Sequence, residues 1–300
     1  MRSETQGVLT MAAAATLWGL NGWFYKFLSH VPPLEVLCHR ILWSVVFFGL
    51  IIVLQGRMAE VRAAFGRNNR VGLLLLSSLL IAVNWFGFVY AVHVGRALEA
   101  SFGYYIFPLM TVAMGYVVFG ERFSRWQMLA VLLAVLAVLV MIPGLGGLPV
   151  ISLVLATSFT CYGLVKKRVT TRPIPGVFIE ALFLLLPSLL WLMAVHFHLS
   201  LAEGPEPGAW FGRDLATTLL LISSGPMTAL PLVLMSNAAQ RISFATLGLV
   251  QYLNPTMQAL VAILVFGEPW TPWHTLAFCL IWSGLIIYSV ESFRRQSRPA

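Results

Sequence analysis

Apolar runs of about twenty residues follow one another along almost the whole chain. A helix that crosses the hydrocarbon core of a bilayer needs about 20 mostly apolar residues, and ten segments meet this requirement. Their expected bounds are 7–28, 33–54, 71–93, 98–119, 124–142, 148–167, 175–198, 215–237, 244–266 and 271–291. The sequence therefore predicts an all-α membrane protein with ten transmembrane helices.

The composition supports a chain whose main solvent is lipid. Hydrophobic residues make up 59% of the 300 residues and charged residues only 10%, whereas a soluble domain carries about 25% charged residues. The net charge of +8 comes from short basic clusters between the apolar runs. Because these clusters are dispersed, we expect no nucleic-acid partner.

The basic residues also orient the chain. With the N-terminus in the cytoplasm, all but four of the 19 Lys and Arg residues fall on the cytoplasmic side, and the exceptions are Lys26, Arg40, Arg96 and Arg213. Short loops rich in Lys and Arg stay inside the cell. We therefore expect a multi-pass protein of the bacterial-type inner (plasma) membrane with both termini in the cytoplasm.

An internal duplication divides the chain into two halves. Tyr105-x-x-Pro108, Phe119-Gly120-Glu121 and Trp126 return as Tyr252-x-x-Pro255, Phe266-Gly267-Glu268 and Trp273, always 147 residues later. Each half holds five expected spans, and because five is odd the second half enters the membrane in the opposite sense. The sequence thus predicts a first five-helix repeat over 1–143 and an inverted second repeat over 144–300.

Inverted repeats of this kind are typical of secondary transporters. Two similar halves in opposite orientations can exchange conformations, so that a site between them opens to each side of the membrane in turn. Pro108 and Pro255 fall near the middle of corresponding spans, where a proline kinks or breaks a helix. Since the freed carbonyls must face protein or water, we expect both prolines to act as hinges beside a central site.

Short motifs spread along the chain add a more specific signal. They are Leu17–Gly19, His39–Ser44, Asn84-Trp85, Leu98–Tyr104, Gly120–Phe123, Tyr162–Val165, Thr246–Gly248 and Gln251-Tyr252. Together with the two Pro…Phe-Gly-Glu units, they resemble the EamA family of the drug/metabolite transporter superfamily, and within it the RarD-like group. The resemblance covers essentially the whole chain.

That resemblance implies ten helices in two inverted five-helix halves, with a cavity lined mainly by helices one, three, four, six, eight and nine. It also implies movement of amino acids, related metabolites or drugs, often outward. Some members of the superfamily export amino acids, aromatic ones included. Export of amino acids or other apolar metabolites is therefore our leading expectation, and the substrate itself stays open.

Polar and aromatic side chains inside the spans are the candidates for a substrate site, since polar groups are costly in lipid. The residues that we expect to line it are Trp18, Asn21, Asn84, Trp85, Tyr104, Tyr162, Gln251, Tyr252 and Asn254. Flat aromatic walls suit apolar or aromatic metabolites. For the amides, the alternative is hydrogen bonding between helices.

Ionisable side chains within or near the spans are candidate charge partners of the substrate. They are Lys26, His39, Arg40 and Glu180. Arg40 and Glu180 fall on corresponding helices, two and seven, and pair either with each other or with charges of the substrate. Lys26 and Arg40 have an alternative role, in which their side chains extend to the outer interface.

Three further carboxylates are expected at helix ends. Glu99 falls near an outer helix start, where it would stabilise the helix dipole. Glu121 and Glu268 each precede the next helix directly, so we expect them to cap a tight turn.

The chain shows no motif for catalysis, a metal or a cofactor. His-Glu-x-x-His, Gly-x-Ser-x-Gly and the glycine-rich lysine motif of ATP hydrolysis are absent, and the three cysteines lie in apolar segments without paired spacing. We therefore expect no enzyme, no catalytic residue, no cofactor and no metal. A channel-like facilitator is the nearer alternative to a carrier, and an intramembrane enzyme the more distant one. The expected partners are a small-molecule substrate and the lipid bilayer, with a homodimer left open.

Overall fold

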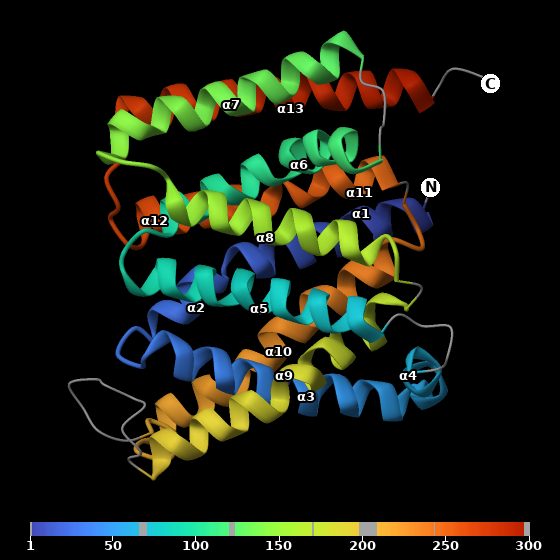
Figure 1. Ribbon diagram of the computed structural model, residues 1–300, viewed down its shortest axis with the longest axis vertical. Helices are drawn as coiled ribbons and strands as arrows, with labels where there is room; N and C mark the ends of the chain where they lie inside the picture. The colour runs from blue at the N-terminus through green and yellow to red at the C-terminus, as the bar shows by residue number, and fades with distance from the viewer. Residues whose placement is uncertain are drawn as a thin grey trace.

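The computed structural model describes residues 2–65, 71–119, 124–169, 171–197, 209–242 and 244–296, and within these ranges every regular element is a helix (Figure 1). The helices are α1 (Arg2–Gly19), α2 (Asn21–Lys26), α3 (Pro33–Leu54), α4 (Met58–Ala64), α5 (Val71–His93), α6 (Ala97–Phe119), α7 (Arg125–Leu145), α8 (Val150–Lys166), α9 (Pro173–His196), α10 (Leu215–Ala238), α11 (Phe244–Gln251), α12 (Leu253–Leu264) and α13 (Pro272–Gln296).

Several of these helices have the length and apolar composition of membrane spans. In the described ranges seven helical stretches meet that standard, namely Pro33–Leu54, Val71–His93, Arg125–Leu145, Pro173–His196, Leu215–Ala238, Thr246–Leu264 and Pro272–Glu291. The helix Val150–Lys166 is apolar but shorter. The chain is thus an all-α, multi-pass membrane protein.

Two of the expected spans are interrupted, each at a single residue. The run 7–28 divides at Leu20 into α1 and α2, and the run 244–266 divides at Tyr252 into α11 and α12. Pro255 falls in the first turn of α12, where its missing N–H would have no intrahelical partner anyway. Pro108, in contrast, lies inside α6 without ending it. The two prolines therefore have different local effects.

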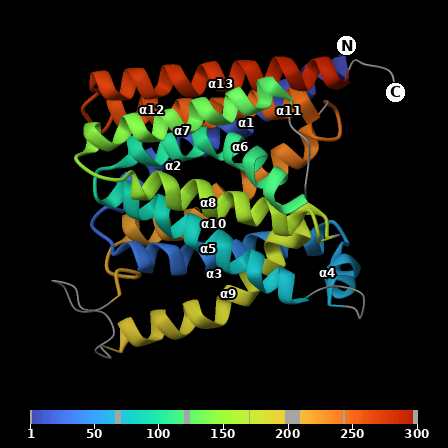
Figure 2. The same ribbon diagram turned by 45° about the horizontal axis from the view of Figure 1, so that its top comes forward.

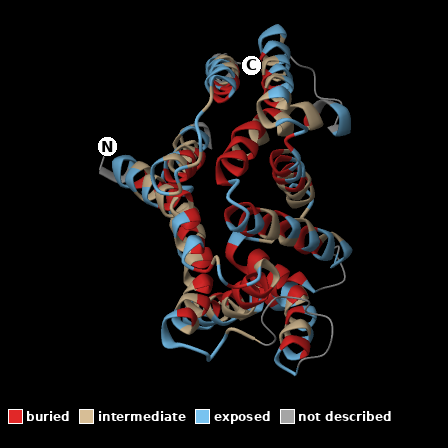
Figure 3. Ribbon diagram, turned by 90° about the vertical axis from the view of Figure 1, so that its left-hand side faces the viewer, coloured by how far each residue is buried: buried red, intermediate tan, exposed pale blue. Residues whose placement is uncertain are grey.

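The long helices lie side by side in one stack (Figure 1). α7 and α13 pack together at one end of the stack, and α3, α9 and α10 pack together at the other. The start of α1 and the end of α13 lie on the same side of the molecule in both views (Figures 1 and 2). Figure 3 shows the buried faces of the helices turned toward one another and the exposed faces turned outward.

Close helix contacts hold the stack together. A Cβ on Gly225 of α10 would lie 2.5 Å from the backbone carbonyl of Trp43 on α3, and one on Gly103 of α6 would lie 2.7 Å from the backbone oxygen of Ser152 on α8. Lipid is as apolar as the helix surfaces, so helices associate mainly through such tight packing of small residues. These glycines thus set how closely the two helix pairs approach.

Candidate functional site

The two interrupted helices touch each other at their breaks. A Cβ on Gly19, the last residue of α1, would lie 2.9 Å from the backbone oxygen of Asn254 in the first turn of α12. Only glycine allows so close an approach. Discontinuous helices that meet in a bundle are a recurring feature of transporter binding sites, because their ends present backbone groups to a ligand.

Buried polar atoms without a hydrogen-bond partner gather beside these breaks. Asn21 directly follows the first break, and its Oδ1 is unpaired; Gln251 directly precedes the second, and its Oε1 is unpaired. The Oε1 of Gln258, in the next turn of α12, is unpaired as well. A buried polar group left unsatisfied costs about 1–3 kcal/mol. These side chains therefore have unused capacity for a ligand.

The other residues expected at this place are more fully packed. The Oδ1 of Asn254 accepts a hydrogen bond of 2.9 Å from Nε2 of Gln258. Tyr252, at the break itself, is half-buried and packs against the larger apolar cluster of the core. Trp18 is half-buried near the end of α1. The structure thus brings five of the nine expected lining residues to the contact between α1, α2, α11 and α12.

Arg40 is a buried cation surrounded by aromatic rings. Its side chain on α3 is only 4% exposed, and its Nε donates a hydrogen bond of 2.9 Å to Oγ1 of Thr228 on α10. The guanidinium carbon lies 4.3 Å from the centre of the Trp85 ring and 5.5 Å from that of Tyr25. Among the residues that the structure describes, no carboxylate forms an ion pair with Arg40.

Glu180 is a buried anion whose hydrogen-bonding needs are met. Lys166 Nζ lies 2.8 Å from its Oε1, Ser77 Oγ donates to the same oxygen at 2.6 Å, and Tyr162 OH donates to Oε2 at 3.1 Å. Gly176, one turn earlier on α9, makes room for the lysine, since a Cβ there would lie 2.6 Å from Lys166 Nζ. Glu180 therefore pairs with Lys166 and not with Arg40.

Five aromatic rings connect the surroundings of these two charges. Neighbouring ring centroids are 6.2 Å apart for Tyr25 and Phe88, 6.1 Å for Phe88 and Tyr104, 6.2 Å for Tyr104 and Phe159, and 5.8 Å for Phe159 and Tyr162. We call these five residues the aromatic series. Its first ring contacts Arg40 and its last donates to Glu180. A continuous aromatic path thus joins a buried cation to a buried anion.

Asn84 serves helix packing beside this path. Its Nδ2 lies 3.0 Å from the backbone oxygen of Leu155 and 3.3 Å from Ser158 Oγ, and its Oδ1 accepts from Tyr104 OH at 2.9 Å. The amide thereby connects α5 with α6 and α8. Hydrogen bonding between helices, the alternative to ligand binding, is the role that this geometry supports for Asn84.

Lys26 and His39 contact rings outside the aromatic series. Lys26 is exposed, with its Nζ 5.3 Å from the centre of the Phe266 ring. His39 is buried, and its ring stacks on Phe211 at 4.9 Å while both ring nitrogens lack a hydrogen-bond partner. The structure therefore does not bring these two candidates to the charges of Arg40 or Glu180.

Carboxylates cap helices other than the ones predicted. Glu268 accepts from the backbone N–H groups of Ala97 and Leu98 at 2.7 and 2.8 Å, so it caps α6 rather than its own turn. Burial raises the pKa of Glu268, although these N–H groups oppose the shift. Glu99 accepts from the N–H of Ile151 at 3.0 Å and so caps α8 rather than its own helix. Glu121 lies outside the described residues.

A cavity of about 720 Å³ opens between the ends of α3, α9 and α10. Its lining includes Gln55, Ile174, Val233, Ser236 and Asn237. These helices are the second, seventh and eighth expected spans. Of these, the eighth is also among the spans that the family resemblance implies as lining a cavity, and the second and seventh are not. The oxygen of Ser236 inside the cavity has no hydrogen-bond partner.

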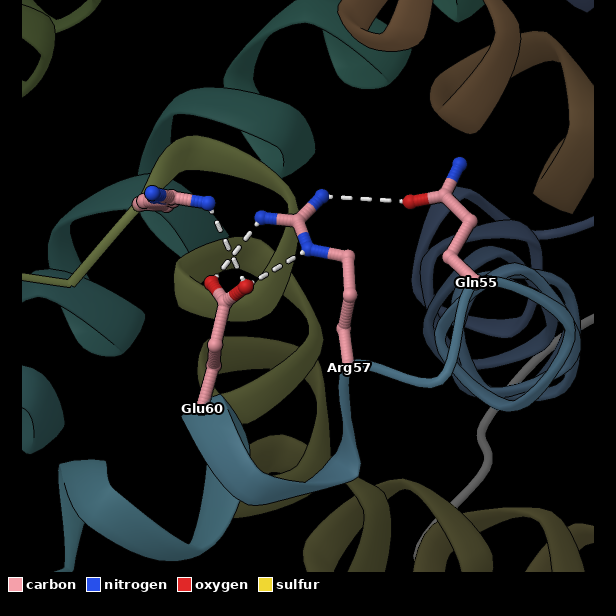
Figure 4. A network of polar contacts seen from close by, with 4 residues as sticks. Gln55, Arg57 and Glu60 are labelled. Carbon is pink, nitrogen blue, oxygen red and sulfur yellow. Dashed lines mark hydrogen bonds and ion pairs between the residues drawn. The ribbon is translucent and has the colours of Figure 1, made fainter.

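A polar network forms the rim of this cavity (Figure 4). Arg57 donates through Nε and NH2 to the two oxygens of Glu60, both at 3.0 Å, and through NH1 to Gln55 at 3.2 Å. Arg172 reaches the same carboxylate at 3.4 Å. The hydrogen bonds from Arg57 and the charges of both arginines lower the pKa of Glu60.

Three residues near the charges were not among the predicted site residues. Thr228 and Ser77 bind Arg40 and Glu180 across helix interfaces, and no local pattern marks them. Lys166 follows Tyr162 by four residues on α8, so that both fall on one helix face, which is a signal that the sequence did contain. In the described part of the chain, no group of three or more His, Cys, Asp or Glu side chains could hold a metal ion.

Comparisons with known proteins agree with the resemblance noted in the sequence. The model of the EamA-like transporter family matches residues 5–142. Protein RarD of Escherichia coli is 35% identical and covers 100% of this chain and 99% of its own length. An uncharacterized transporter of Vibrio cholerae is 35% identical, covering 96% of this chain and 93% of its own length. The chloramphenicol-sensitive protein RarD of Pseudomonas aeruginosa is 30% identical, covering 100% of this chain and 99% of its own length.

A solved crystal structure shares the same architecture. It superposes with a TM-score of 0.60 and covers 95% of this chain and 97% of that chain, at 15% sequence identity. Identity at this level supports the fold alone.

Proposed function

The chain belongs to the EamA-like transporter family, and on this premise we propose that it is a secondary transporter of the bacterial-type inner membrane that exports small apolar metabolites, amino acids among them, by alternating access. Its relatives are named transporters, so the chain is a membrane transporter and not an enzyme. The ten spans, the inverted halves, the substrate and the direction are parts of the proposal.

The packing of the helices supports two inverted halves, 1–143 and 144–300. Under the repeat, α1, α3, α5 and α6 correspond to α8, α9, α10 and the pair α11 and α12. The contact of α6 with α8 then corresponds to that of α11 and α12 with α1, and the contact of α5 with α8 to that of α10 with α1. The contact of α3 with α10 corresponds to that of α9 with α5. The pairs α3 with α9 and α7 with α13 are each made of corresponding spans. Exchanging the two halves leaves this set of contacts unchanged, as a two-fold axis in the membrane plane requires.

The orientation is argued from charge and from the position of the ends. The start of α1 and the end of α13 lie on the same side of the molecule, which is also the side of α4 (Figure 1). Arg57 and Arg172 lie at helix ends on that side. Because basic residues favour the cytoplasmic face, we place both termini in the cytoplasm and the cavity between α3, α9 and α10 open toward it.

One observation carries the proposal about the substrate: the aromatic series that runs between Arg40 and Glu180. Aromatic walls hold apolar molecules with little specificity, and the buried cation Arg40 at one end favours a polar group on the substrate. The interrupted helices beside Asn21 and Gln251 supply the parts that rearrange, with Pro108 and Pro255 as hinges.

Counterflow in liposomes tests this function. Purified protein is reconstituted into vesicles loaded with unlabelled phenylalanine, and a trace of labelled phenylalanine is added outside. A carrier accumulates label transiently, because outward movement of the unlabelled substrate drives inward movement of the label. A channel-like facilitator shows no such accumulation. Since one relative is named a chloramphenicol-sensitive protein, labelled chloramphenicol is the second probe.

Variants test the placement of the site. Gln251→Leu and Tyr252→Leu alter the second break, and Trp18→Leu alters the end of α1 beside the first break. We expect each to lower the initial rate at least several-fold with unchanged yield in detergent. Wild-type rates in all three variants would show that the substrate site lies elsewhere in the protein. Absence of counterflow for every substrate in a broad panel would contradict the carrier.

A further inference from the structure

Arg40 and the corresponding residue of the second half, Glu180, differ in how their charges are compensated. Arg40 and Glu180 stand the same number of residues after the proline that begins α3 or α9. Glu180 has a lysine 2.8 Å away and two hydroxyl donors. Arg40 has one hydroxyl acceptor and two aromatic faces, and within the described ranges it has no carboxylate. One position is thus neutralised by the protein and the other is not.

An uncompensated guanidinium inside a bilayer is costly. A charge buried without a partner destabilises a protein, and contacts with aromatic faces offset only part of that cost. The bond to Thr228 occupies Nε alone. Of the guanidinium nitrogens, Nε is the one with a hydrogen bond of standard geometry to a described residue, so the two terminal nitrogens are available to an anion.

A second donor lies beside these nitrogens. The hydroxyl of Tyr25 is directed toward Arg40 and Thr228, yet it forms no hydrogen bond of standard geometry. Thr228 itself donates to the backbone oxygen of Ser224 at 2.9 Å and has no further proton to offer. The O–H of Tyr25 and the fork of Arg40 therefore lie beside each other, while the ring of Trp85 covers the face of the guanidinium.

We propose that Arg40, Tyr25 and Trp85 form a subsite for the carboxylate of an apolar organic acid. Two parallel N–H donors match the two oxygens of a carboxylate, the tyrosine supplies a third donor, and the aromatic series offers apolar surface next to the anion. This subsite deepens the proposed transport function and rests on it for its biological meaning. Binding, however, is measurable without transport.

Binding to protein in lipid nanodiscs is the test. The probe is 3-phenylpropionate, which has a carboxylate and no ammonium group, and the comparison is 3-phenyl-1-propanol, which has neither charge. We expect the acid to bind at least about tenfold more tightly than the alcohol, since hydrogen bonds to a charged group account for such a ratio. Equal affinities of the acid and the alcohol would overturn the subsite.

Variants assign the preference to this cluster. Arg40→Gln should abolish the preference for the acid, and Tyr25→Phe should reduce it several-fold. Arg40→Lys keeps the charge and loses the fork, so it should give an intermediate preference and also serves if Arg40→Gln does not fold. The matched control is Arg213→Gln, which removes another arginine that stacks on a tryptophan ring, Trp210 at 4.7 Å, at an exposed position. A full preference in folded Arg40→Gln or Arg40→Lys would refute the assignment.

The two proposals fail in different ways. Specific binding of the acid without counterflow in liposomes contradicts the carrier and leaves the subsite standing. Counterflow that is equally fast for substrates with and without a carboxylate, and unchanged in a folded Arg40 variant, supports the carrier and rules out the subsite.

Discussion

Glu268 accepts a hydrogen bond from the backbone N–H of Ala97, which lies 171 residues earlier in the chain. A carboxylate from the loop between α12 and α13 thus caps the start of α6, and it also accepts a hydrogen bond from the next backbone N–H, that of Leu98. The first N–H groups of a helix have no intrahelical partner, and a negative charge there also interacts favourably with the helix dipole.

Glu268→Gln should therefore lower the stability of the folded protein by about 1 kcal/mol. The amide has a single acceptor oxygen for two N–H groups, and it carries no charge. Thermal unfolding in detergent, followed by size-exclusion chromatography, measures the effect. Glu4→Gln, at an exposed position in the first turn of α1, is the comparison: it also removes a charge near a helix start, but at an exposed position, and should lower the midpoint less than Glu268→Gln. An unchanged midpoint for Glu268→Gln would show that this cap contributes nothing.

The ion pair between Lys166 and Glu180 predicts a rescue. Lys166→Met leaves the fully buried Glu180 without its countercharge and should cost about 3–5 kcal/mol. The double variant Lys166→Met/Glu180→Gln should recover most of that loss, since Ser77 and Tyr162 still find a polar partner. Unfolding of both variants in the same detergent gives the comparison. A double variant as unstable as the single one would contradict the interpretation.

The contact of α10 with α3 predicts a steric effect at Gly225. In Gly225→Ala the new methyl group would lie 2.5 Å from the backbone carbonyl of Trp43, which cannot move aside as a side chain can. The helices must separate, and we expect a loss of about 1–3 kcal/mol. Gly163→Ala on α8, where no atom lies within 4 Å of the new Cβ, is the matched control. Equal stability of the two variants would refute the close contact.

The network of Arg57, Glu60 and Arg172 predicts a dependence on pH. The pKa of Glu60 lies below its ordinary value of 4.5 in the folded protein. The folded state therefore binds this proton less readily than the unfolded state, and stability from this group is complete above the ordinary value and lost as the pH falls through the folded value. Wild type should unfold at a higher temperature than Glu60→Gln above pH 5, and the two should converge in acid. A difference that stays constant down to pH 3.5 would argue against the network.

The sequence predicted some helix bounds closely, and Pro255 signalled the interruption three residues before it, at Tyr252, but no residue signalled the one at Leu20. The spans 33–54 and 71–93 coincide with α3 and α5, because turn-forming or charged segments flank these apolar runs. The division at Leu20 carries no proline, and it becomes evident only where Gly19 meets Asn254 of a distant helix. Contacts between distant helices cannot be derived from the periodicity of either helix alone.

In the candidate site, too, the sequence predicts single residues but not the contacts between distant helices. Residue type marked Arg40 and Glu180 as candidates, since charges are rare within apolar runs. It did not identify their partners, because Thr228 and Ser77 meet them only after α3 packs on α10 and α5 packs on α9. The lining role expected for Asn84 stays a prediction. Its hydrogen bonds to three neighbours fit the alternative of helix packing, and residue type alone does not distinguish the two roles.

The close approach of Gly103 to Ser152 contrasts with that of Gly19 to Asn254. In the first contact both helices, α6 and α8, are uninterrupted; in the second, α1 and α12 meet at breaks, and under the proposed repeat these are the counterparts of α8 and α6. Two corresponding helix pairs thus have different conformations within a single molecule, one continuous and one interrupted. If straightening one pair accompanies bending of the other, the ground state and the alternative related to it by the two-fold axis differ by little more than which pair is bent. Neither direction of the cycle would then need a large energy input.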